Sequence, residues 1–187
     1  AALAGQTQAQ TVTNYWDFSS MDDVVGGVAG TAMGTPDLSL HATYGEAYPG
    51  SGATLNTMYG GTPAGGGYIS ADVWDGANPT ALDFGTDSWS FSYWVYDNYA
   101  ADGDVKGPRI FDCLPSTTIG IQLGTEATPY FNFRIDDDEG AATISNTAGL
   151  TVYHSVDQWV HVAVTVDRTG GVVEVWFDGV SQGTYNL

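Results

Sequence analysis

The chain has 187 residues, and 22 aspartates and glutamates stand against 4 lysines and arginines, which gives a formal net charge of -18. Hydrophobic residues make up 43% of the chain, so it does not match the disordered class, which combines high charge with low hydrophobicity. The negative charge excludes nucleic acids and anionic lipid surfaces as partners, because both require clustered basic residues, and no apolar run is long enough for membrane insertion. Divalent cations and glycans remain open as ligands.

The first ten residues are small or polar and carry no charge. They are similar to the end of a secretory signal peptide, which has small residues two positions apart, as at 2–4 and 7–9. The single cysteine, Cys113, excludes an intrachain disulfide, which suits a cytosolic protein or a secreted one that does not rely on disulfides. We expect residues 1–11 to be a signal remnant or a flexible, extended terminus. Residues 12–187 are then one folded domain of a secreted or cell-surface protein.

The half of the chain before residue 86 is rich in glycine, which predicts loops with only short strands. Alternating apolar and polar residues predict a first strand at 12–18, and shorter ones at 37–41 and 68–73. Loops on a rigid β scaffold are where binding sites usually lie, so we expect this half to contribute to a site.

The second half shows clearer alternation of β-branched and aromatic residues. It predicts strands at 89–96, 109–113, 118–123, 131–135, 143–145, 159–167 and 172–177. Four valines from Val160 to Val166 share one face of a strand, an Asp-rich turn is expected at 136–140, and Asp178-Gly179 is a two-residue hairpin signal. Antiparallel hairpins at this spacing predict an all-β fold with two antiparallel sheets, a jelly roll or β-sandwich.

Two segments of the sequence resemble a known family. Residues 159–167, a glycine turn and residues 175–179 resemble the paired strands of laminin-G-like domains, which belong to the concanavalin A-like lectin/glucanase superfamily. Residues 84–95 look like the first long core strand of that family. The resemblance implies a concanavalin A-like sandwich over residues 14–187. It also implies further strands after the Asp-Gly hairpin, which this sequence lacks. We therefore expect an open sheet edge, either because the sequence is truncated or because another chain covers that edge.

A glycoside hydrolase is the enzyme that this resemblance raises. Hydrolases of the fold resemble one another in an E-x-D-x-x-E strand, which supplies the paired carboxylates of acid and nucleophile, and the chain lacks it. Its nearest equivalent is Glu174 with Asp178, and Asp178 falls in a turn. His161 is expected to be structural and Cys113 to be a small buried hydrophobe. We therefore expect no enzymatic activity.

Acidic residues in three loops are candidate calcium ligands, because calcium takes carboxylate and carbonyl oxygens from flexible loops. The candidates are Asp22, Asp23, Asp102, Asp104, Asp136, Asp138 and Glu139. The pair at 22–23 is the one that the resemblance suggests. Aspartate is also typical of plain solvated turns, which is the alternative for each loop.

Aromatic side chains beside loops are candidate platforms for a sugar ring, since the apolar face of a sugar stacks on them. The candidates for ligand binding are Trp74, Tyr96, Tyr99 and Tyr130. The tryptophans expected in strands are assigned to the core: Trp16, Trp89, Trp94, Trp159 and Trp176.

Taken together, these features predict a secreted, non-catalytic recognition or adhesion module for an extracellular glycan or protein, with calcium as a structural or bridging ion. One alternative is a structural subunit of an extracellular assembly, in which residues 1–13 of one chain pair with the open edge of the next. A glycoside hydrolase on the same fold is the second alternative.

Overall fold

The computed structural model describes residues 11–35, 38, 45–52, 68–71, 87–96, 109–112, 120–125, 131–137, 140–144, 155 and 157–186. All regular secondary structure in these residues is β-strand. The strands are β1 (Gly30–Met33), β2 (Tyr68–Ala71), β3 (Trp89–Tyr96), β4 (Arg109–Asp112), β5 (Gly120–Thr125), β6 (Phe131–Asp137), β7 (Gly140–Ile144), β8 (Trp159–Asp167), β9 (Val172–Phe177) and β10 (Val180–Asn186). The described residues include no helix long and apolar enough to cross a membrane.

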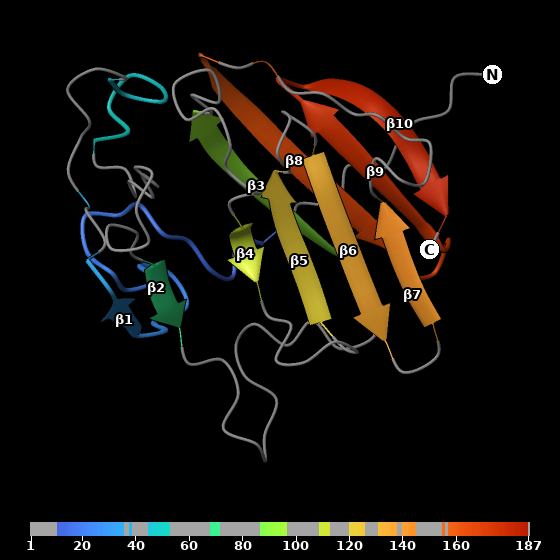
Figure 1. Cartoon of the computed structure of the whole chain (residues 1–187), viewed down its shortest axis with the longest axis horizontal. Helices are drawn as coiled ribbons and strands as arrows, with labels where there is room; N and C mark the ends of the chain where they lie inside the picture. The colour runs from blue at the N-terminus through green and yellow to red at the C-terminus, as the bar shows by residue number, and fades with distance from the viewer. Residues whose placement is uncertain are drawn as a thin grey trace.

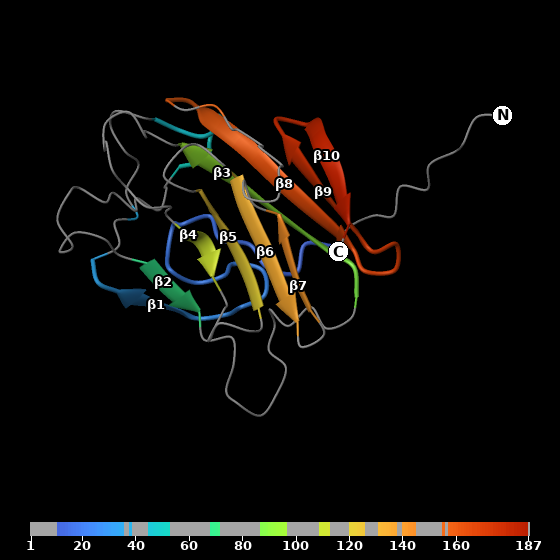
Figure 2. The ribbon, with the colours of Figure 1, turned by 45° about the vertical axis from the view of Figure 1, so that its right-hand side comes forward.

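The strands form two four-stranded antiparallel sheets and one small ribbon. The core sheet has the order β10-β9-β8-β3, the second sheet has the order β4-β5-β6-β7, and β1 pairs with β2. Figures 1 and 2 show the second sheet stacked against one face of the core sheet, with the β1–β2 ribbon beside them. The protein is an all-β, antiparallel two-sheet sandwich, as the sequence predicts.

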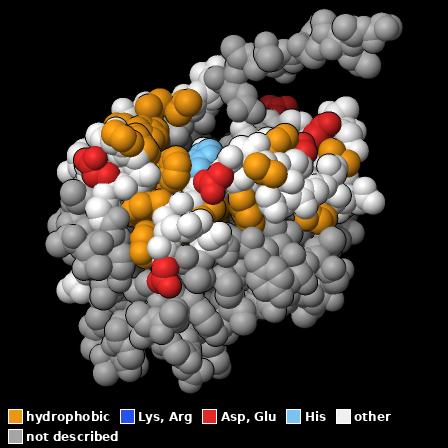
Figure 3. Space-filling model, turned by 90° about the horizontal axis from the view of Figure 1, so that it is seen from above, with side chains coloured by type: hydrophobic (Ala, Val, Ile, Leu, Met, Phe, Trp, Pro, Cys, Tyr) orange, Lys and Arg blue, Asp and Glu red, His pale blue; other side chains and the backbone are white. Residues whose placement is uncertain are grey.

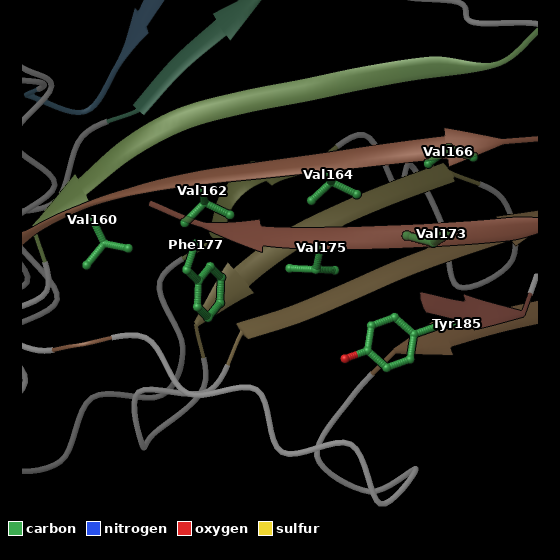
Figure 4. Close-up of a cluster of buried hydrophobic side chains, with 8 residues drawn as sticks. All are labelled: Val160, Val162, Val164, Val166, Val173, Val175, Phe177 and Tyr185. Atoms are coloured by element: carbon green, nitrogen blue, oxygen red, sulfur yellow. The ribbon is translucent and has the colours of Figure 1, made fainter. Parts of the chain in front are cut away.

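The hydrophobic core lies on one face of the core sheet. Successive side chains of a strand point to opposite faces, so the valine alternation of β8 places one complete row on the inner side. The buried side chains are Val160, Val162, Val164, Val166, Val173, Val175, Phe177 and Tyr185. Figure 4 shows them along β8, β9 and β10. Four residues of β3 pack against this cluster: Trp89, Phe91, Tyr93 and Val95. Each fully buried valine contributes roughly 1.5 kcal/mol or more to stability.

The turns of the core sheet follow the sequence signals. Asp178 and Gly179 join β9 to β10 with φ of 48° and 78°, the backbone of a type I′ hairpin turn. β8 and β9 are joined by residues 168–171, and Gly171 has a φ of 65°. The predicted strands at 89–96, 159–167 and 172–177 have these bounds in the structure.

Two predictions are wrong. Residues 12–18 form no strand, because the Asp23 side chain hydrogen-bonds the Tyr15 backbone that a ladder would need. The turn at 136–140 is shorter than expected, since β6 extends to Asp137 and β7 begins at Gly140. Asp136 therefore lies within a ladder, paired with Gly120 and Ala141. Of the strand expected at 37–41, only residue 38 is described, and it is not in a strand.

Candidate functional site

The outer face of the core sheet, opposite the valine row, carries several large aromatic side chains. Trp94 of β3 is directly opposite His161 of β8, and Tyr96 is opposite Trp159. On the next strand, Trp176 is opposite Ala163. Because the inner face is filled by the valine core, these side chains are placed away from it.

Four of the aromatic side chains form a connected series, here called the aromatic row: Tyr15, Tyr48, Trp94 and His161. The ring centroids of Trp94 and His161 are 5.1 Å apart with an interplanar angle of 45°. Those of Tyr48 and Trp94 are 5.8 Å apart at 43°. The phenol oxygens of Tyr15 and Tyr48 lie 3.3 Å apart, and this hydrogen bond raises the pKa of Tyr15. The row thus joins the N-terminal segment to the centre of the sheet.

The aromatic row is accessible to solvent. The exposed fractions are 43% for Tyr15, 40% for Tyr48 and 39% for Trp94, and His161 is half-buried. Figure 3 shows a histidine at the surface with hydrophobic side chains around it and carboxylates close by. Exposed rings in mutual contact present a continuous apolar surface with polar groups at its rim.

A carboxylate lies at the end of the row. The backbone N–H of Asp178 donates to the carbonyl of His161 at 2.9 Å, and the backbone N–H of His161 donates to Oδ1 of Asp178 at 2.9 Å. The turn conformation of Asp178 therefore fixes its carboxylate beside His161, on the side away from Trp94. This side chain is exposed.

The aromatic row was only partly foreseeable. The prediction that Trp94, Trp159 and Trp176 lie in the core is wrong, because the buried valines alternate with the positions of these tryptophans, whereas Trp89 packs against the core as predicted. The register of β3 on the valine strand could have shown this. Tyr48 carries no local signal, since its contact with Trp94 joins segments 46 residues apart. Tyr96, a predicted ligand residue, lies on the same face and meets Trp159 edge-on, with centroids 5.5 Å apart.

A laminin-G family model, described as the concanavalin A-like lectin/glucanases superfamily, matches residues 64–187, more than half of the chain. The protein belongs to the concanavalin A-like lectin/glucanase superfamily. The match covers β2 to β10 and includes Trp94, His161 and Asp178, whereas Tyr15 and Tyr48 precede it. A comparison with curated proteins gives no match. Membership establishes the fold, and the ligand has to be argued from the site.

Asp22 and Asp23, the pair that the resemblance suggests for calcium, accept hydrogen bonds from N–H groups. Asp23 is 3% exposed, and Oδ1 accepts hydrogen bonds from the backbone of Tyr15 at 2.7 Å and of Val25 at 2.9 Å. Its Oδ2 accepts from the Asn14 side chain at 2.6 Å. Oδ1 of Asp22 accepts from the backbone of Gly30 at 2.9 Å, which closes the segment onto β1.

The pKa of Asp23 shows how strongly these N–H groups stabilise its ionised carboxylate. Burial alone would raise the pKa, but the N–H groups of Tyr15, Gly26, Val25 and Asn14 lower it to about 2. One buried oxygen, Oδ1 of Asn14, has no hydrogen-bond partner within the described part of the chain. A single neutral oxygen does not make a calcium site, which takes six to eight oxygens. The carboxylate of Asp23 thus accepts N–H donors on both oxygens and holds the loop together, and calcium binding at Asp22 and Asp23 stays a prediction.

Most of the other predicted site residues lie outside the residues that the structure describes. Those outside are Trp74, Tyr99, Asp102, Asp104, Tyr130, Asp138 and Glu139. For Asp136, the structure describes the backbone in β6. Within the described residues, no three histidine, cysteine or acidic side chains gather where they could hold a metal ion.

The superfamily includes glucanases, and Glu174 of β9 with Asp178 of the following turn is the carboxylate pair nearest to the hydrolase motif. Glu174 lies in β9 and Asp178 is the first residue of the turn after it, four positions on, so their Cα atoms are at most ~13 Å apart. Glycosidase carboxyl groups lie about 5 Å apart in retaining enzymes and at most about 9.5 Å apart in inverting ones. Each carboxylate also has a local partner, since Ser181 donates to Glu174 at 2.7 Å and His161 to Asp178. This pair does not have the arrangement of a hydrolase.

Proposed function

We propose that the protein is a non-catalytic recognition module that binds an extracellular glycan through the aromatic row. The observation that carries the proposal is the exposure of Trp94, which is 39% exposed on the outer face of the outer strand β3 and contacts Tyr48 on one side and His161 on the other. A tryptophan that only filled the core would lie on the inner face with the valines.

The chemistry of the row suits a saccharide. Rings supply an apolar surface for the C–H face of a sugar, while a small number of fixed polar groups give orientation. Here the polar groups are the Tyr15 and Tyr48 hydroxyls, the His161 ring and the Asp178 carboxylate. His161 sits on a stiff part of the sheet, because β8 is paired on both sides, with β3 and β9, and Asp178 is held in the turn that follows β9.

The proposal of a binding module without catalysis is supported by the separation of Glu174 and Asp178 and by the absence of the hydrolase strand motif from the sequence. Secretion is part of the same proposal, and it is supported by the uncharged, small-residue segment at 1–10. Calcium stays a prediction for Asp22 and Asp23 and for the acidic segments at 102–104 and 136–139. An increase in melting temperature with calcium, reversed by a chelator, would support it.

A glycan array with Trp94→Ala tests the proposed function. We expect the wild-type protein to bind a set of neutral or basic glycans, and the variant to lose about tenfold in affinity for each, because central aromatic residues dominate binding energy. Met33→Ala is the matched control, since Met33 is 40% exposed and lies on the β1–β2 ribbon away from the row. An unchanged melting temperature would show that both variants are folded. A wild-type protein that binds no glycan, or a Trp94 variant that binds as well, would overturn the proposal.

A further inference from the structure

The charges beside the aromatic row are of one sign. Asp178 ends the row with an exposed carboxylate, and of the four basic residues of the chain the structure describes only the side chain of Arg168. Arg168 follows the last residue of β8, seven positions from His161, which places it ~23 Å away along the strand. Within the described residues, with His161 counted as neutral, the row therefore has a carboxylate beside it and no lysine or arginine.

The Asp178 carboxylate is positioned for a ligand. Its Oδ1 accepts the His161 N–H, and among the described residues Oδ2 has no hydrogen-bond partner. The strands of Trp94 and Asp178 are two strand spacings apart, ~10 Å, with His161 between them. A ligand ring on Trp94 can thus direct a neighbouring substituent toward Oδ2 across the His161 ring.

We propose that the aromatic row prefers glycans with free amino groups, that is, glycans whose sugars carry an ammonium substituent. This inference rests on the proposed function and specifies its ligand class. An ammonium group is attracted both by the faces of tryptophan and tyrosine rings and by a carboxylate. The formal net charge of -18 adds a long-range attraction for cationic polymers and repels uronic-acid or sulfated ones.

Four oligosaccharides of equal length separate the contributions: glucosamine, N-acetylglucosamine, glucose and glucuronic acid. N-Acetylation removes the charge of glucosamine and keeps its ring and linkage. By titration calorimetry at a pH at which the amine is protonated, we expect glucosamine oligomers to bind best, N-acetylglucosamine and glucose oligomers more weakly, and glucuronic acid oligomers not at all. The preference for the amine should decrease at high salt, because exposed charges are screened.

Asp178→Asn tests the residue that carries the preference. Asparagine keeps an Oδ1 acceptor for the His161 N–H and tolerates the positive φ of this turn, so the variant should fold. We expect about a twofold to fivefold loss of affinity for glucosamine oligomers and a smaller loss for N-acetylglucosamine oligomers, because the amide keeps a hydrogen-bonding group at this position and removes only its charge. Asp167→Asn is the matched control, because Asp167 is also an exposed carboxylate that accepts a backbone N–H, from Gly170 at 2.8 Å, at the far end of β8.

The outcomes distinguish the two proposals. Equal binding of glucosamine and N-acetylglucosamine oligomers, with loss of both in Trp94→Ala, would overturn the preference for amines and leave the proposed function intact. Binding of no saccharide would overturn both. An equal effect of Asp167→Asn and Asp178→Asn would show that net charge alone attracts the amine, and would overturn the assignment to this site.

Discussion

Different interactions order the backbone in the β8–β9 hairpin and in the segment of residues 11–28. In the hairpin, paired strands satisfy the backbone, and a repeating valine pattern buries one face. The N-terminal segment has no regular structure, and its order centres on one carboxylate, Asp23, that accepts N–H groups from both ends of the loop. The comparison shows that order in this protein is distributed over many weak contacts in one region and concentrated on one strong acceptor in the other.

The largest effect on stability is expected from a charged side chain on the buried face of the β8–β9 hairpin. Val164→Asp places a carboxylate in the centre of the valine core, where no described side chain can neutralise it. We expect a loss of more than about 4 kcal/mol in the free energy of unfolding, or no folded protein at all. Urea denaturation followed by tryptophan fluorescence measures this. The control is Thr165→Asp on the outer face of the same strand, and equal stability of the two variants would contradict the assignment of the faces.

Removing the carboxylate of the N-terminal segment should have a large but local effect. Asp23→Ala leaves the N–H groups of Asn14, Tyr15 and Val25 without their acceptor, so we expect about 3 kcal/mol of local destabilisation. Hydrogen exchange should then become fast in residues 14–28 and stay slow in β8 and β9. Asp22→Ala, which removes one hydrogen bond to Gly30, is the milder comparison. Loss of protection throughout β8 as well would contradict a local role.

Replacing a glycine in β10 is expected to have an intermediate effect on the free energy of unfolding. Gly183 has a φ of 135°, and a Cβ there would lie 3.1 Å from the Tyr185 hydroxyl oxygen. Gly183→Ala should therefore cost about 1–3 kcal/mol in the free energy of unfolding, measured by thermal denaturation. Gly45→Ala is the comparison for a glycine of positive φ without crowding, since Gly45 has a φ of 65°, in the left-handed region that alanine can adopt, and no atom lies within 4 Å of a built Cβ. A cost no larger than that of Gly45→Ala would contradict the strain expected at Gly183.

The smallest expected effect is a pH dependence that comes from Asp23. Its folded pKa of about 2 lies below the ordinary value of 3.8, so its contribution to stability is complete above pH 3.8 and is lost as the pH falls through 2. Between pH 5 and pH 3 we expect a loss of about 1 kcal/mol in wild type from this group. Asp23→Asn should lack that part of the pH dependence in urea titrations at each pH. The same slope in both proteins would contradict the assignment.

The same contrast explains which features the sequence could predict. The strand at 159–167 and the turn at Asp178-Gly179 follow from local rules, a period of two and a two-residue turn that tolerates positive φ. The failed strand at 12–18 also alternates, but its hydrogen bonds go to Asp23, and no local rule signals a partner eight residues along the chain. The contact between Tyr48 and Trp94 depends on how a loop returns to the sheet. A periodic pattern predicts which side chains share a face, whereas a long-range contact requires the fold itself.

The bulge in β10 has a further consequence for the edge of the core sheet. In the described sheet β10 is an outer strand, and its pairing with β9 shifts between Ser181 and Gly183. A bulge interrupts the spacing of the outward N–H and C=O groups and increases the local twist, so a second chain finds no continuous template there. A valine-rich hairpin with a flat outer strand would favour aggregation. The extra residue at Gln182 therefore makes edge-to-edge pairing of two chains through β10 less favourable, and it makes the β9–β10 ladder less regular.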